Sequence, residues 1–451
     1  MKRNFFIAAI ILQATLGVVA QETKKLTLKD CVKLAVEQNI NTRTARIENE
    51  KSKYKKEETR AALLPKLNMS AQFTDNLALP TTVLPGDFFG KPGTTIAVQM
   101  GSQFSTTASL SLSQVIYSQT ALTALQLSKK SEQLTSLSVE KASEEVAFEV
   151  ARLYVLNQTT VEQQRIISEN IKRTEKLQQI TRLTVETGLG KQVDLDRVNV
   201  NLENLYTQKS NTDAALEQQI NMIKYLTGLS ATQEIALTDS VTQPLSAVEP
   251  VLMNDFSENV NIRMLQSQKE LNMLNKKLVN SGYLPTLSLS GQAAYQGLRN
   301  DFSTYFESGS ANKWYPMANF SVSLSVPIFD GFEKRAKSRQ ASMDIKKTSE
   351  TLESTKENYG VNYKNALNTY INNRATVKRQ RQNVELSEKV YQETSLKLNQ
   401  GLATMSTLLQ DEMSLSSAQA NYLSALYNLK EAELKIMSIN GKIKDLYNST
   451  N

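Results

Sequence analysis

The sequence predicts an α+β membrane protein in which one module, made of long α-helical hairpins and two β-strands, occurs twice. Three observations carry this prediction: landmarks that recur in one order, four segments of polar–apolar alternation, and two helical segments of about 70 residues each. Among the landmarks, Leu64-Pro65-Lys66-Leu67 returns as Leu284-Pro285-Thr286-Leu287 after 220 residues, and Gly188 and Gly228 return as Gly401 and Gly441, both after 213. A repeat of this length indicates two whole modules rather than a short-repeat solenoid.

The composition argues against an enzyme. The chain has 451 residues, 40% hydrophobic and 22% charged, with 52 Lys and Arg against 45 Asp and Glu, no His and one Cys. The lack of His excludes imidazole catalysis and His-based metal sites, and a single Cys excludes an internal disulfide. We therefore expect no catalytic residue and no metal site; an enzyme built only on carboxylates or lysines is a distant third alternative. The net charge of +7 is a weak argument for nucleic acid.

Residues 1–20 are predicted to be an export signal. Two cations precede an apolar run from Phe5 to Leu12, and Ala20 offers a small residue for cleavage before Gln21. The alternative, an uncleaved membrane anchor, needs about 20 apolar residues, which is more than this run provides.

Four segments alternate between apolar and polar residues with the period of a β-strand, and strands are expected at about 66–77, 103–114, 286–297 and 317–327. A soluble sheet with one wet face is one explanation. A membrane barrel is the more specific explanation and the one we favour, because each segment has about the 10 residues that a tilted membrane strand needs. In addition, the polar faces carry Ser, Thr, Asn and Gln and almost no charge. Aromatic residues near the strand ends suit an interfacial girdle: Phe88, Phe89, Tyr295, Phe302, Tyr305, Phe306, Trp314 and Tyr315.

Helices are expected to fill the rest of each module. The first repeat, 21–228, should hold helices at 27–63, 118–187 and 193–228, and the second repeat, 251–441, helices at 251–283, 332–400 and 404–440. In each repeat the two short helices together match the long one, which predicts a hairpin of even height, about 100 Å at 1.5 Å per residue. Thr27 and Asp30 form a helix-start pattern, so Cys31 is expected to be a small buried helix residue. Residues 229–250 are expected to be an irregular linker and 442–451 a C-terminal tail.

Four strands cannot close a barrel, and an open sheet edge in lipid leaves unpaired backbone groups that cost several kcal/mol each. The sheet must therefore be completed by further copies of the chain. Two copies give eight strands, whose interior is filled by side chains, and three give twelve strands, which leave room for a lumen. Closed cyclic symmetry is the usual solution.

The duplicated order of helix, two strands, long helix, glycine turn and helix resembles that of the TolC-like outer-membrane efflux proteins. The resemblance covers nearly the whole mature chain, and further residues carry it: Thr27-Leu28 with Ala35 and Asn39, both Leu-Pro-x-Leu junctions, Val326-Pro327-Ile328-Phe329-Asp330-Gly331, and Gly401 followed by Leu408-Leu409. It implies a homotrimer with a 12-stranded outer-membrane β-barrel continuous with a periplasmic α-helical barrel. It also implies an exit duct that meets a periplasmic adaptor protein and an inner-membrane RND or ABC transporter. The pump supplies the energy in this family, so no cofactor is expected in this chain.

The resemblance also assigns site residues. The turns 187–195 and 399–408 would form the periplasmic tip that closes the channel and engages the adaptor, although both glycines also suit simple helix C-caps. The residues expected there are Gly188, Leu189, Asp194, Asp196, Gly401, Leu402, Thr404, Thr407 and Gln410, and those at the helix–strand junctions are Pro65, Pro285 and Pro327. Asp194 matches the family's acidic gate position. Asp196, Asp411 and Glu412 would supply further acidic charge nearby or, equally, be solvated helix residues. The family's Tyr and Arg positions fall on Leu398 and Ala403, and its lumenal aspartate ring falls on Thr407 and Gln410, so neither a salt-bridged gate nor that ring carries over.

The rival hypothesis from another class is a secreted or periplasmic coiled-coil structural protein without a channel, which would be soluble without detergent. Two weaker motifs do not change the choice. Gly188-Leu189-Gly190-Lys191 follows a helix rather than a strand and lacks the Ser or Thr of a phosphate loop. The basic run Arg374, Lys378, Arg379 and Arg381 lies within a long helix and is expected to be a solvated face or lumen lining rather than a nucleic-acid site.

Overall fold

The structure is a computed structural model that describes residues 24–240, 255–307 and 313–448. The expected export signal at 1–20 lies outside the described residues. The chain divides into two compact units, one formed by Met1–Ile47, Leu137–Met264 and Leu352–Asn451 and the other by Glu48–Ser136 and Leu265–Thr351. Among the described residues, no helix combines the length and the apolar character needed to cross a bilayer.

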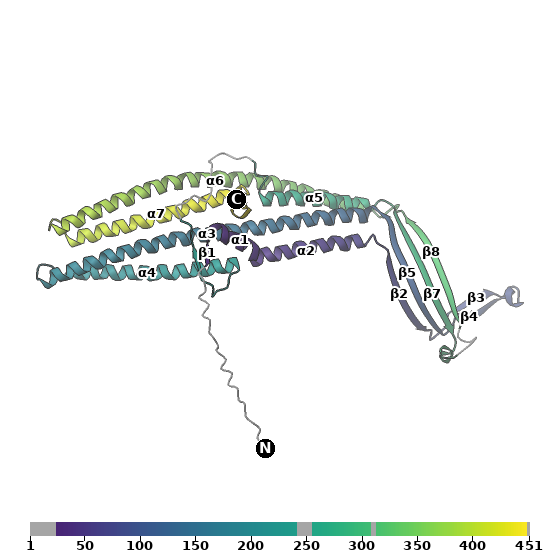
Figure 1. Cartoon of the computed structure of the whole chain (residues 1–451). Coiled ribbons are helices and arrows are strands. Elements are labelled where there is room, and N and C mark those ends of the chain that lie inside the picture. Colours follow the sequence, from purple (N-terminus) through teal and green to yellow (C-terminus); the bar gives the residue numbers. More distant parts are fainter. Residues whose placement is uncertain (1–23, 241–254, 308–312, 449–451) are drawn as a thin grey trace, which may run out of the picture. The chain divides into compact units, whose positions relative to one another are not determined.

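The second unit contains an antiparallel sheet of four strands (Figure 1). Its strands are β2 (Lys66–Asp75), β5 (Phe104–Ser118), β7 (Thr286–Arg299) and β8 (Trp314–Ser325), joined in the order β2–β5–β7–β8. Each module thus supplies one pair, and the middle pairing of β5 with β7 joins the two modules. The outer edges of β2 and β8 have no strand partner within the described part of the chain.

The alternation in the sequence gives this sheet two different faces. Leu67 lies opposite Leu112 and Met69 opposite Leu110, so apolar side chains share one face across the strands. On the other face hydroxyl groups bond across strands, with 2.8 Å between the oxygens of Ser290 and Ser321. The apolar face is largely uncovered: Met69 is 79% exposed and Phe320 69%.

Four helices have residues in both units: α2 (Ile40–Ala61), α3 (Gln119–Glu186), α5 (Val260–Ser281) and α6 (Glu333–Asn399). Within the second unit, polar contacts tie their segments together. Lys56 of α2 pairs with Glu132 of α3 at 2.6 Å, and Asn272 of α5 donates to Thr348 of α6 at 2.8 Å. Such exposed or half-buried contacts contribute about 1 kcal/mol or less each.

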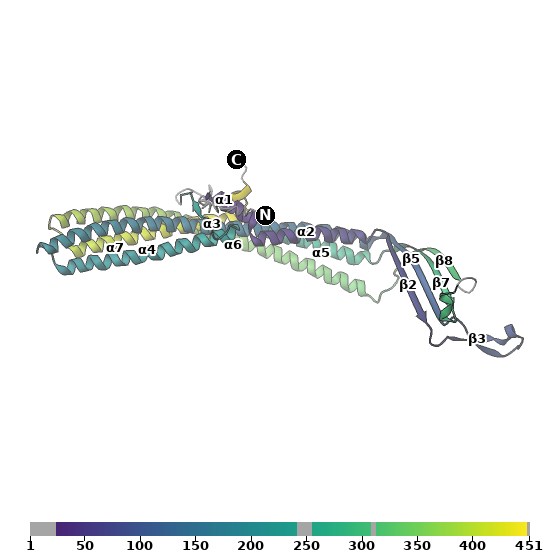
Figure 2. The same cartoon turned by 60° about the horizontal axis from the view of Figure 1, so that its bottom comes forward.

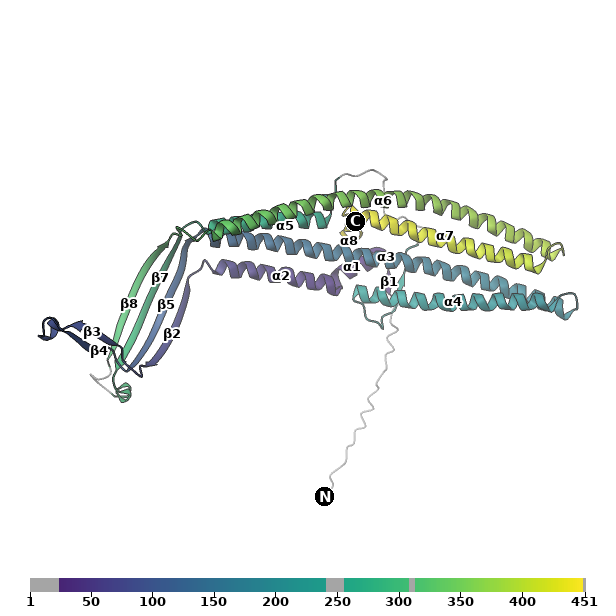
Figure 3. The same cartoon turned by 180° about the vertical axis from the view of Figure 1, so that it is seen from behind.

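The first unit contains two helical hairpins, α3 with α4 (Gln192–Thr227) and α6 with α7 (Met405–Ile439). Their helices lie alongside one another in each view (Figure 1, Figure 2 and Figure 3). The largest core cluster adds α1 (Leu28–Gln38) and the segment before α8 (Asp445–Asn448); its members include Cys31, Val150, Ile223, Leu434 and Ile443. Cys31 is fully buried and Thr27 forms the expected capping box with Asp30, so both local predictions are confirmed.

Two of the expected helices are shorter or interrupted, for the same reason in both modules. The helix expected at 27–63 is broken at Asn39, and the helix expected at 251–283 begins at Val260. Asn39 accepts from the backbone N–H of Asn41 at 2.9 Å and donates to the carbonyl of Leu226 at 3.0 Å. In the second module, Asn259 accepts from Asn261 at 3.0 Å and donates to Ile439 at 3.0 Å. Each asparagine caps a new helix and ties it to the end of the returning one.

Short elements lie in segments expected to be irregular. Within 229–250, β6 (Ile235–Leu237) pairs in parallel with β1 (Lys24–Leu26), and the expected tail 442–451 holds α8; residues 241–250 and 449–451 lie outside the described parts. Between the strands β2 and β5 the chain forms the hairpin of β3 (Thr81–Pro85) and β4 (Thr95–Gln99), closed by a 3-10 helix at Gly86–Phe89. A second 3-10 helix, Phe302–Tyr305, follows β7. Backbone pairing between short segments stabilises elements that are too brief for a periodic pattern.

Candidate functional site

Both hairpins of the first unit turn through the same backbone motif. After α3, Gly188 donates to the carbonyl of Val185 at 2.9 Å and the next residue donates to Thr184 at 3.0 Å. After α6, Gly401 donates to Leu398 at 3.0 Å and the next residue to Lys397 at 2.8 Å. Both glycines have φ of +75°, the left-handed conformation that glycine adopts without strain. The two turns are therefore structural copies of each other.

Each turn presents one large apolar side chain to solvent directly after its glycine. Leu189 is 85% exposed and Leu402 74% exposed. Beyond the turns, Thr404 caps the start of α7, and its hydroxyl accepts from the backbone N–H of Thr407 at 3.2 Å, whereas Lys191 before α4 makes no side-chain cap. The exposed leucines and the glycine turns together give this end of the hairpins a compact, partly apolar surface.

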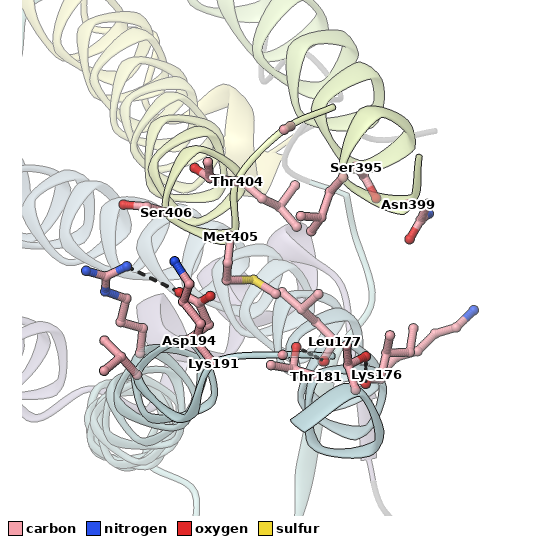
Figure 4. Close-up of a pocket in the computed structure, with 18 of the residues that line it drawn as sticks. Lys176, Leu177, Thr181, Lys191, Asp194, Ser395, Asn399, Thr404, Met405 and Ser406 are labelled. Carbon is pink, nitrogen blue, oxygen red and sulfur yellow. Dashed lines mark hydrogen bonds and ion pairs between the residues drawn. The ribbon is translucent and has the colours of Figure 1, made fainter. Parts of the chain in front are cut away.

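A cleft of about 1190 Å³ opens between the two hairpins at this end. Residues of α3, α4, α6 and α7 and of both turns line it, and Figure 4 shows Met405 projecting into it from the start of α7. The charged lining residues are four cations and one carboxylate: Arg173, Lys176, Lys191, Arg197 and Asp194. The wall of the cleft is thus predominantly basic at neutral pH.

The carboxylates expected at the tip are satisfied locally. Asp194 lines the cleft and accepts from Arg197 on the same helix at 3.3 Å (Figure 4). Asp196 accepts from the Gln192 side chain at 2.9 Å, again within α4. Neither acid makes an ion pair with the other hairpin among the described residues. An exposed pair within one helix contributes about 0.3–0.5 kcal/mol, so these acids do not fasten one hairpin to the other.

The remaining tip positions are neutral. Thr404 lines the cleft, and its hydroxyl lies 2.8 Å from that of Thr407. Thr407 and Gln410, one turn apart on α7, lie outside the cleft lining. Leu398 and Ala403 do line it, as apolar groups.

Glu412 connects the two hairpins from a buried position, so the alternative interpretation of it as a solvated helix residue is wrong. The residue is 4% exposed, its carboxyl oxygen Oε1 lies 2.8 Å from the Thr174 hydroxyl oxygen of α3, and its other carboxyl oxygen accepts from the Asn201 amide of α4 at 3.0 Å. Burial raises the pKa of Glu412, against the opposing effects of Thr174, Arg173 and Asn201. The signal was available, because Glu412 follows Leu408 by four positions and precedes Leu415 by three, which places it on the buried stripe of α7.

The prolines expected at the helix–strand junctions occupy matching positions. Pro65 separates α2 from β2 and Pro285 separates α5 from β7. Before each proline, three successive backbone N–H groups bond three residues back, at 3.0–3.3 Å before Pro65 and 3.1 Å before Pro285. Pro327 follows β8 in an exposed segment without regular secondary structure that leads to Asp330, whose carboxylate accepts from the backbone N–H of Lys334 at 3.1 Å. These prolines end one element and leave the next free to start.

Among the described residues, no group of three or more Cys, Asp and Glu side chains is placed to hold a metal ion. Taken together, the sheet with one apolar and one polar face and the hairpins that end in matched glycine turns define the fold of an outer-membrane efflux channel.

Comparison with known proteins agrees with this fold. The family model described as outer membrane efflux protein matches residues 31–229 and 258–442, and the chain belongs to that family. The open state of the MtrE outer membrane channel of Neisseria gonorrhoeae is similar with a TM-score of 0.73 and 18% identity, over 94% of this chain and 91% of that one. The outer membrane protein VceC of Vibrio cholerae gives 0.72 and 13%, over 92% and 96%. The CmeC outer membrane channel of Campylobacter jejuni gives 0.71 and 16%, over 92% and 85%. No functionally curated protein matches the chain.

Proposed function

We propose that three copies of this chain form the exit duct of a tripartite efflux or type I secretion system. Each copy contributes four strands to a closed twelve-stranded barrel in the outer membrane, and its helices contribute to a periplasmic tube. Substrates pass through passively, driven by a pump in the inner membrane. The duct itself carries out no reaction and needs no cofactor.

The observation that carries this proposal is the exposed apolar face of a sheet with two open edges. Met69 and Phe320 are among the apolar side chains that are mostly exposed on that face, and β2 and β8 lack outer partners among the described strands. In water such a surface favours aggregation. In lipid the face is solvated, and pairing β8 of one copy with β2 of the next satisfies both edges. Cyclic closure with three copies leaves a lumen lined by the hydroxyl and amide face.

The tip is proposed to close the duct and to receive a periplasmic adaptor protein. The exposed side chains of Leu189 and Leu402 offer apolar contacts at the ends of two rigid hairpins. An RND or ABC transporter in the inner membrane is the pump class that such an adaptor would join. This role rests on family membership and on the geometry of the two matched turns.

The competing function is a secreted or periplasmic coiled-coil rod in which the β segments pack on each other. The two differ in what covers the apolar strand face, lipid or protein. We would express the full chain, fractionate the membranes, and record currents from the detergent-purified protein in planar bilayers. Outer-membrane recovery with stable unitary currents is expected. A chain that remains soluble without detergent and forms no channels would overturn the duct and favour the rod.

A further inference from the structure

Glu412 links the two hairpins of the first unit by hydrogen bonds between the largest core cluster and the tip. In the segments 160–210 and 385–420, all of them described, both side-chain hydrogen bonds from one hairpin to the other end on its carboxyl group. Leu408 and Leu415, one turn away on either side, are each 1% exposed. The carboxyl group is therefore largely shielded from water while the hairpins stay together.

The hydrogen-bond distances at this link favour one form of the carboxyl group. Thr174 has a single hydroxyl hydrogen, yet its oxygen lies 2.9 Å from the carbonyl of Asn170 and 2.8 Å from Oε1 of Glu412. If that hydrogen goes to the carbonyl, as is usual for a helical threonine, then the contact with Glu412 needs a hydrogen on the carboxyl group. The other oxygen still accepts from Asn201. A neutral carboxyl group satisfies every partner at once.

We propose that Glu412 fastens the α6–α7 hairpin to the α3–α4 hairpin as a neutral carboxyl group, and that its ionisation releases them. Parting the hairpins widens the tip, so Glu412 is a positioning residue for opening the duct. The inference rests on the proposed channel function and adds its regulation by protons. It differs from a salt-bridged gate, because no ion pair joins Glu412 to a cation in the described structure.

The groups that face Glu412 set the direction of the pH response. From α3, Arg173 lies near enough to favour the ionised form, but its guanidinium stacks over the Tyr391 ring of α6 at 5.4 Å; from α4, the facing group is the neutral Asn201. Burial outweighs these effects and raises the pKa of Glu412 above 4.5. The stabilisation of the closed tip is therefore complete below about pH 4.5 and is lost as the pH rises through the raised pKa. Each titrating copy can change the opening equilibrium by at most about tenfold per pH unit.

The test is the open probability of the reconstituted full chain in planar bilayers from acidic to mildly alkaline pH. E412Q is isosteric with the neutral acid, since its amide can donate to Thr174 and its carbonyl can accept from Asn201. It should stay closed at every pH. E412L keeps the volume without the hydrogen bonds and should be open at every pH, whereas the wild type opens as the pH rises. E393Q makes the same chemical change at an exposed residue of α6 and should follow the wild type.

The outcomes separate this inference from the proposed function. A wild type that forms no channels at any pH contradicts the duct itself. A conducting wild type whose pH response persists in E412Q, or an assembled E412L that gates like the wild type, overturns the role of Glu412. If E412L fails to assemble, the wild type and E412Q still decide, because a flat E412Q profile beside a pH-dependent wild type supports the role and identical profiles refute it.

Discussion

Gly441 lies just after the end of α7, close to the backbone of Glu258 that precedes α5. Replacing Gly441 with alanine should destabilise the first unit more than the same change at Gly401. Both glycines are left-handed, with φ of +68° and +75°. An alanine in that conformation costs about 1–2 kcal/mol. At Gly401 an added methyl group meets no atom within 4 Å, so this strain is the whole cost.

At Gly441 the methyl group would lie 2.6 Å from the carbonyl oxygen of Glu258 and 2.9 Å from its carbon. Those atoms are backbone and precede Asn259, whose side chain ties α5 to the end of α7, so they cannot rotate away. Overpacking of this kind costs about 1–3 kcal/mol. We expect G441A to lose about 2–5 kcal/mol in total and G401A about 1–2 kcal/mol.

Thermal unfolding of the two purified variants beside the wild type, followed by far-ultraviolet circular dichroism, checks this difference. G401A is the matched control, because it carries the same backbone strain without the collision. Equal shifts in Tm for the two variants, or a larger shift for G401A, would refute the close approach of α7 to Glu258.

Three further predictions follow from other parts of the molecule. F320K puts a cation on the apolar face near the middle of β8 and should destabilise the membrane-inserted state by about 2–4 kcal/mol per copy, whereas S321K on the polar face should insert normally. The yield of membrane-assembled protein compares the two variants, and equal yields would argue against lipid contact. D194A removes the carboxylate of the cleft and should change conductance or cation preference in planar bilayers; an unchanged current and selectivity would remove Asp194 from the gate. Burial and the repulsion of Glu140 raise the pKa of Glu144 from 4.5 to about 7. The neutral carboxyl group therefore favours the folded state, and this contribution to stability is fully present below about pH 4.5 and is lost as the pH rises through 7. E144Q should therefore exceed the wild type in stability by up to about 3 kcal/mol near pH 8 and match it near pH 4, and a pH-independent difference in denaturant midpoint would contradict this.

The fold class could be predicted because its signals are long and repeated. Alternation over about ten residues indicates a strand that is exposed to two different environments, and it assigns Leu67 and Leu112 to the apolar face on which the register pairs them. The helices α3 and α6 could be predicted from the lack of glycine and proline over most of their length. The duplication then placed Gly188 and Gly401 in equivalent turns, and their backbone bonds are equivalent in the structure.

The details that were missed depend on contacts distant in the sequence. Asn39 and Asn259 occupy equivalent positions in the two modules, but their contacts with the carbonyl groups of Leu226 and Ile439 exist only in the folded chain. β1 has three residues, too few for any periodicity, and exists because β6 pairs with it.

At the tip, the family motif indicates Asp194, whose carboxylate pairs with Arg197 of its own helix. The sequence already places Glu412 among the acidic residues near the tip, and its position between Leu408 and Leu415 puts it on the buried stripe of α7. The sequence pattern can place a carboxyl group there, but the donors from α3 and α4 become visible only once the hairpins are packed.

The measurement that tests the account most directly is electron microscopy of the detergent-extracted mature protein, with symmetry and length determined from averaged images. The account predicts a hollow tube of threefold symmetry with a helical shaft of about 100 Å, the length of about 70 helical residues. Solid or twofold rods, or particles that stay dispersed without detergent, would contradict the duct.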